Sequence, residues 1–103
     1  MSTSTNKVAL VTGASDGIGA EFVQILAGRG YDLILVARRK EKLDQLAVKL
    51  SDEFGVNCTV MAADLSEPKA AQNLFQRVED SGLKVNFLIN NAGLLHNGFF
   101  TKL

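Results

Sequence analysis

The chain has 103 residues, of which 47% are hydrophobic and 21% charged, a composition typical of one small globular domain. Eleven basic and eleven acidic side chains balance, so we expect no nucleic-acid or membrane partner. No apolar run approaches the ~18 residues of a membrane span, and residues 1–6 form a short polar tail. One cysteine, Cys58, and one histidine, His96, exclude disulfide scaffolds and zinc modules, and we predict no metal site. We therefore expect a cytoplasmic α/β domain.

The first part of this domain reads as a strand followed by a helix. Residues 7–12 are a short apolar run that ends at a glycine, which predicts a buried strand. From Gly17 onward, large apolar residues recur at helical spacing, and the helix should end near Gly28 or Gly30. The predicted buried face of this helix consists of Ile18, Phe22, Ile25 and Leu26.

The same alternation continues along the chain. Residues 33–37 are a second continuous apolar run, which predicts another buried strand, and residues 43–54 carry the spacing of a second amphipathic helix. Residues 56–63 alternate between apolar and polar, which predicts an outer strand. Ser66 is a capping residue type and Pro68 is tolerated in a first turn, so together they predict the start of a third helix.

Residues 85–89 predict a fourth strand, followed by a loop rich in Asn and Gly. Strands that alternate with helices imply right-handed crossovers and a parallel sheet. Two units wound outward, then a crossover to the other side of the first strand, give a Rossmann-type doubly wound sheet of order 3-2-1-4. A flavodoxin-like order has the same alternation, so periodicity alone leaves it open.

A glycine-rich turn, Thr-Gly-Ala-Ser-Asp-Gly-Ile-Gly at residues 12–19, joins the first strand to the first helix. Gly13 permits a tight turn, Gly17 lets the backbone approach a pyrophosphate, and Gly19 lets the helix pack closely on the sheet. The helix N-terminus then faces the phosphate. The alternative is a turn that needs glycine for its geometry alone. The candidate cofactor-binding residues of this turn are Gly13, Ser15, Asp16, Gly17, Ile18 and Gly19.

The end of the second strand predicts which cofactor binds. An acidic residue about 20 positions after the glycine turn would bind the ribose 2′-hydroxyl of NAD. That position is Ala37, and Arg38 and Arg39 follow it. A guanidinium forms a two-pronged bond with a 2′-phosphate, so we predict NADP rather than NAD. The alternative is that both arginines belong to an exposed charge run, and Asp16 near a phosphate is unfavourable.

Together these motifs resemble the short-chain dehydrogenase/reductase family. Its glycine pattern is similar to residues 12–19, its acidic adenine contact is similar to Asp64-Leu65, and its Asn-Asn-Ala-Gly signature is similar to residues 90–93. The resemblance implies oxidoreduction of a carbonyl or alcohol by hydride transfer, with Ala37-Arg38-Arg39 similar to the NADP-preferring members. It adds further candidate cofactor-binding residues, which are Asp64, Leu65, Asn91, Ala92 and Gly93.

The catalytic signature of that family is missing from this sequence. Its Tyr-x-x-x-Lys pair has no counterpart, because the single tyrosine, Tyr31, is followed four positions later by Leu35. We therefore predict no catalytic residue and interpret residues 7–103 as the N-terminal, cofactor-binding part of one Rossmann domain, truncated after the fourth strand. Its full-length parent is expected to be a homo-oligomer that acts on a small carbonyl or alcohol substrate. The alternatives are a non-catalytic NADP(H)-binding module or a nonfunctional truncated product.

Overall fold

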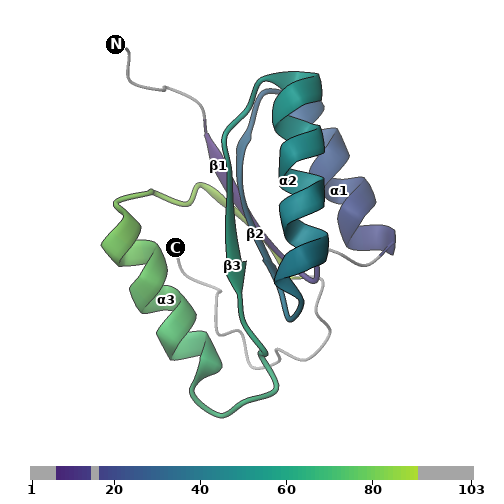
Figure 1. Ribbon diagram of the computed structural model, residues 1–103. Helices are drawn as coiled ribbons and strands as arrows, with labels where there is room; N and C mark the ends of the chain where they lie inside the picture. The colour runs from purple at the N-terminus through teal and green to yellow at the C-terminus, as the bar shows by residue number, and fades with distance from the viewer. Residues whose placement is uncertain (1–6, 15–16, 91–103) are drawn as a thin grey trace.

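The computed structural model describes residues 7–14 and 17–90, and its layered arrangement is drawn in Figure 1. The sheet has the order β3-β2-β1-β4 with parallel pairing throughout. This is the predicted Rossmann-type order, and the flavodoxin-like alternative is excluded because β3 lies beside β2. The elements are β1 (Val8–Thr12), α1 (Gly17–Gly28), β2 (Asp32–Ala37), α2 (Lys40–Phe54), β3 (Cys58–Ala62), α3 (Ala70–Ser81) and β4 (Phe87–Asn90).

Helices cover both faces of this sheet, with α1 and α2 on one side and α3 on the other (Figure 1). Strands β1 and β2 are buried along their whole length, as their continuous apolar runs predict. Alternate side chains supply two cores, so Ala9 and Val11 pack on the α1–α2 side while Val8 and Leu10 pack on the α3 side. The domain therefore has two apolar layers separated by the central strands.

The buried face of α1 differs from the prediction. Ile18 and Ile25 are 64% and 56% exposed, and of the four predicted residues the structure buries Leu26. The residues that face the sheet are Gly19, Val23, Leu26 and Ala27. Gly19 and Ala27 on this face have little or no side chain, so the helix can approach the sheet more closely than large side chains at these positions would allow. Close approach therefore decides the orientation of α1, and side-chain size alone predicts the wrong face.

The start of α3 also differs from the prediction. The helix begins at Ala70, and Lys69 precedes it without a side-chain cap. Ser66 instead donates its hydroxyl to Asp64, and the amide of Glu67 donates to the carbonyl of Asp64 at 3.0 Å. Ser66 lies four residues before Ala70 and forms its hydrogen bonds with Asp64, so it serves a turn before the helix and not the helix itself.

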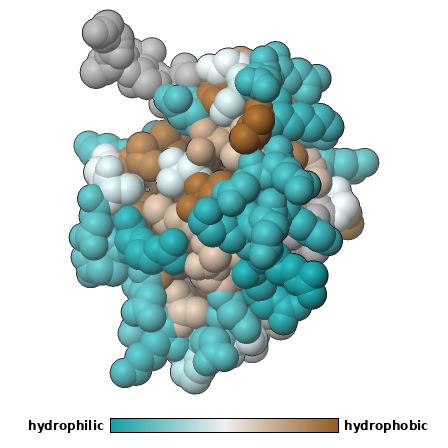
Figure 2. All heavy atoms as spheres, in the orientation of Figure 1, coloured by the Kyte–Doolittle hydropathy of each residue, from teal (hydrophilic) through white to brown (hydrophobic). Residues whose placement is uncertain are grey.

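The outer strand is β3, as the alternation of residues 56–63 predicts. It pairs with β2 along one side, from Leu33↔Cys58 to Ala37↔Ala62. Most of its residues are partly exposed. Figure 2 shows the result as a strip of apolar residues along the middle of this view, over β3 and between hydrophilic residues on both sides. Within residues 7–14 and 17–90, no helix has the length and apolar character needed to cross a membrane.

Candidate functional site

The carboxyl ends of all four strands meet at one edge of the sheet, the lower edge in Figure 1. The register places Thr12 beside both Val36 and Asn90, and Ala37 beside Ala62. The crevice beyond β1 is the point where the strand order reverses, because β2 and β4 flank β1 on opposite sides. Ligands of open α/β sheets bind at such a reversal.

The glycine turn begins directly at the end of β1. Gly13 has φ of 65°, a left-handed conformation that glycine adopts without strain, as the sequence predicts. The amide of Ala14 donates to the carbonyl of Val36 at 3.1 Å, which fastens the turn to the end of β2. Gly17 opens α1 and is exposed, while Gly19 is buried against the sheet. The glycine turn is therefore connected to β1 by the chain itself and to β2 by the hydrogen bond of Ala14.

Two arginines follow β2 at the same edge. Arg38 is exposed, and Arg39 precedes α2 in an extended conformation without a side-chain cap on the helix. Lys40, the next residue, forms an ion pair with Asp44 at 2.9 Å on the surface of α2. The charged residues after β2 therefore differ in their environment, because Lys40 pairs with Asp44 on α2 while Arg38 lies at the edge of the sheet.

Asp64 follows β3 at the same edge of the sheet, near Arg38. The preceding amide, that of Ala63, donates to the carbonyl of Ala37 at 2.9 Å and fastens this segment to β2. Hydrogen bonds from the hydroxyl and amide of Ser66 lower the pKa of the Asp64 carboxyl, and the positive charge of Arg38 lowers it further. Two segments that the sequence singles out separately, Arg38 and Asp64, are therefore electrostatic neighbours.

An open pocket of about 590 Å³ adjoins Asp64 on the α3 side of the sheet. Arg77 of α3 lines this pocket and donates to the carbonyl of Ala62 at 2.8 Å. Leu65 is partly buried and packs against the core on the α3 side. The pocket is lined by Ala62, Ala63, Asp64, Glu67, Pro68, Lys69, Ala70, Asn73, Leu74 and Arg77.

The structure brings together the predicted residues of three segments, those after β1, β2 and β3. Ser66 is the residue that the sequence analysis missed as a site residue, although the Asp-x-Ser spacing is a signal for a side-chain-to-backbone turn. Five predicted residues lie outside the described part of the chain, and they are Ser15, Asp16, Asn91, Ala92 and Gly93.

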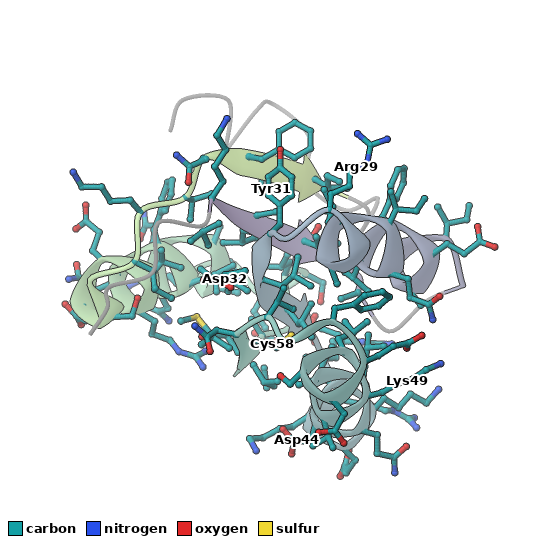
Figure 3. The ribbon with its side chains drawn as sticks, turned by 90° about the horizontal axis from the view of Figure 1, so that it is seen from above. Arg29, Tyr31, Asp32, Asp44, Lys49 and Cys58 are labelled. Carbon is teal, nitrogen blue, oxygen red and sulfur yellow. The ribbon has the colours of Figure 1, made fainter. Side chains whose placement is uncertain are left out.

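Tyr31, Asp32 and Cys58 lie at the opposite edge of the sheet, onto which Figure 3 is viewed. The ring of Tyr31 lies 6.3 Å from that of Phe87, and Asp32 accepts a 3.0 Å hydrogen bond from the amide of Asn57. Burial raises the pKa of the Cys58 thiol, which therefore stays protonated at neutral pH. In the described residues no cluster of metal-ligating side chains occurs. This edge is built for packing.

Sequence comparison extends these observations. The family model described as short chain dehydrogenase matches residues 7–103. A very-long-chain 3-oxoacyl-CoA reductase of Phaeosphaeria nodorum is 47% identical over 86% of this chain and 27% of its own length. A 17-beta-hydroxysteroid dehydrogenase type 3 of Danio rerio is 36% identical over 98% of this chain and 32% of its own length. The chain thus spans about a third or less of the length of these relatives.

Solved structures give the same result. A short-chain dehydrogenase from Sphingobium yanoikuyae in complex with NADPH superposes with a TM-score of 0.76, at 44% identity over 84% of this chain and 33% of that one. L-sorbose reductase from Gluconobacter frateurii, complexed with NADPH and L-sorbose, superposes with a TM-score of 0.80, at 33% identity over 95% of this chain and 37% of that one.

Proposed function

Because the chain belongs to the short chain dehydrogenase family, we propose that it is the NADP-binding part of an oxidoreductase that transfers hydride between nicotinamide and a carbonyl or alcohol carbon. The observation that carries the cofactor proposal is the place of Arg38, at the end of β2 between the glycine turn and Asp64, with the uncharged Ala37 before it. Related structures that contain NADPH support the same cofactor.

Each segment of the edge would hold one part of the cofactor. The glycine turn and the N-terminus of α1 offer backbone amides to the pyrophosphate. Arg38 and Arg39 offer guanidinium groups to the 2′-phosphate. Asp64 offers a carboxylate oxygen to the adenine amino group. Residues 91–93, which match the signature of the family, would close the cleft.

When bound, the cofactor supplies or accepts the hydride. Reduction of a ketone also builds negative charge on oxygen, which needs a positioned acid or hydrogen-bond donor. The sequence contains no Tyr-x-x-x-Lys pair, and its single tyrosine lies at the amino edge of the sheet, opposite the glycine turn. We therefore propose that these 103 residues bind NADP(H) without turning over a substrate, which is also the behaviour of a non-catalytic binding module.

The curated relatives suggest which substrate to test on the whole protein. Those named very-long-chain 3-oxoacyl-CoA reductases reach 47% identity, which supports a 3-oxoacyl thioester as the first candidate. The proposal takes the whole protein to be a cytoplasmic homo-oligomer, in keeping with the balanced charge and the family resemblance.

The test is a pair of titrations followed by an assay. Calorimetric titration of the purified protein should give a dissociation constant for NADPH about tenfold or more below that for NADH. Equal constants would contradict the NADP proposal, and failure to bind either cofactor would contradict the site. The assay then adds a 3-oxoacyl-CoA and follows the loss of NADPH absorbance, which separates an enzyme from a binding module. The whole protein should consume NADPH, and the 103-residue chain should not.

A further inference from the structure

The carboxylate of Asp64 is held in one orientation by a single neighbour. Its Oδ1 accepts a 2.6 Å hydrogen bond from the hydroxyl of Ser66 and a 3.0 Å hydrogen bond from the amide of Ser66. The amide of Glu67 closes the same turn onto the carbonyl of Asp64, and Ala63 fastens it to β2. Asp64 is only partly buried, so these hydrogen bonds restrain its side chain more than packing does.

The two carboxylate oxygens are thereby divided between two tasks. Oδ1 is used within the turn, whereas Oδ2 has no hydrogen-bond partner among the described residues. An ionised carboxylate only accepts hydrogen bonds, so the free oxygen suits a ligand that presents an N–H donor. The two bonds from Ser66, with help from Arg38, lower the pKa of this carboxyl, and it therefore stays ionised at neutral pH.

We propose that Ser66 is a positioning residue for cofactor recognition, which fixes Asp64 so that its Oδ2 accepts a hydrogen bond from the 6-amino group of adenine. This inference rests on the proposed function, because it concerns the same dinucleotide site. Ser66 does not touch the cofactor itself. It removes the rotational freedom that the carboxylate would otherwise lose on binding, and fixing a group in its bound orientation raises affinity.

A purely structural role for Ser66 makes a different prediction. If the hydroxyl only shaped the turn, its loss would alter the fold and weaken every ligand of the site equally. The structure argues against this, because Ser66 is exposed and α3 begins at Ala70 without using it as a cap. The hydrogen bond from the backbone N–H of Ser66 to Asp64 also remains when the hydroxyl is removed, so the turn keeps the hydrogen bonds that its backbone makes.

The experiment compares two cofactors that differ only in the group that Asp64 would recognise. The analogue of NADPH in which unsubstituted purine replaces adenine carries a hydrogen atom where adenine carries its amino group. In the purified protein, Ser66→Ala should raise the dissociation constant of NADPH about threefold to tenfold and change that of the analogue by less than about twofold. The preference for adenine therefore shrinks, and Ser66→Thr, which keeps a hydroxyl, should restore it.

Ser81→Ala is the matched control. It removes a serine hydroxyl of the same kind, one that donates a 2.6 Å hydrogen bond to Val78 at the other end of α3. It should leave the ratio of the two dissociation constants unchanged. Equal weakening of both cofactors by Ser66→Ala, or weakening of neither, would overturn this inference alone. Failure of the unaltered protein to bind NADPH would overturn the proposed function as well.

Discussion

The two residues at the end of β2 determine the charge that faces the cofactor. Ala37 ends the strand and leaves no carboxylate there, while Arg38 follows with an exposed guanidinium. The double substitution Ala37→Asp with Arg38→Leu should therefore reverse the cofactor preference. The loss of a two-pronged bond to a charged group should weaken NADPH binding about tenfold to a hundredfold, as titration with both cofactors would measure.

Two single substitutions serve as controls for that reversal. Arg38→Leu alone should weaken NADPH and leave NADH nearly unchanged, because NADH has no 2′-phosphate. Lys40→Leu removes a neighbouring positive charge that is already paired with Asp44, so it should change neither constant by more than about twofold. An unaltered preference in the double variant would mean that the arginines form an exposed charge run and no more.

Gly17 gives a prediction about the pyrophosphate. A Cβ at this position would meet no atom within 4 Å, so the fold accommodates a side chain there. The same Cβ would occupy the space that a pyrophosphate needs at the start of α1. Gly17→Val should therefore abolish NADPH binding in calorimetry while the melting temperature stays close to that of the unaltered protein.

Gly28 provides the control for this substitution at the other end of α1. A Cβ there would contact the ring of Phe54 at 3.6 Å, an ordinary packing distance. Gly28→Ala should leave NADPH affinity intact. If Gly17→Val also left the affinity intact, the glycine turn would serve the geometry of the strand–helix connection and not a phosphate.

Among the helices, α2 shows how far burial separates residues that lie two positions apart. Leu50 is fully buried in the core on the α1–α2 side, whereas Val48 is 62% exposed. Leu50→Ala should lower the free energy of unfolding by about 2–5 kcal/mol, because it leaves a cavity. Val48→Ala should change it by about 0.5 kcal/mol or less in urea denaturation. Similar losses for both variants would mean that α2 packs in a different orientation.

The helices also show where sequence reasoning stops. Their existence, their order and the end of α1 near Gly28 or Gly30 follow from spacing and glycine placement, and the structure ends α1 at Gly28. The buried face of α1 does not, because helical spacing fits both Ile18–Phe22–Ile25 and Gly19–Val23–Ala27. The choice depends on how closely the helix approaches the sheet. The start of α3 is also predicted wrongly, because Ser66 forms its hydrogen bonds with Asp64 in a turn that precedes the helix.

For the molecule as a whole, the strand order could be predicted, because alternation and right-handed crossovers leave few topologies. The parallel sheet then carries the ends of β1, β2 and β3 to one edge, where Gly13 and Arg38, predicted from their spacing, lie with Asp64, predicted from the family resemblance. The orientation of the Asp64 carboxylate could not be assigned, because it depends on distances within a turn.

The pairing of β1 with β4 predicts an order of folding. Val8 pairs with Asp32 of β2. It also forms hydrogen bonds with both the side chain and the backbone of Asn86, which lies 78 positions away, directly before β4. The longer connection, roughly three times as many residues, costs about 1 kcal/mol more to close. Pulse-labelled hydrogen exchange during refolding should protect the amides of β2 before those of β4. Simultaneous protection would contradict this order.

The same pairing has a consequence for the protein while it is being made. Strand β1 leaves the ribosome before β2, β3 and β4, yet one of its edges stays unpaired until β4 has been translated. At 5–20 residues per second, the intervening residues take roughly 4 to 16 s to synthesise. An open apolar strand edge is a template for pairing with another chain. The speed of translation between β1 and β4 therefore sets how long each nascent chain is exposed to that risk.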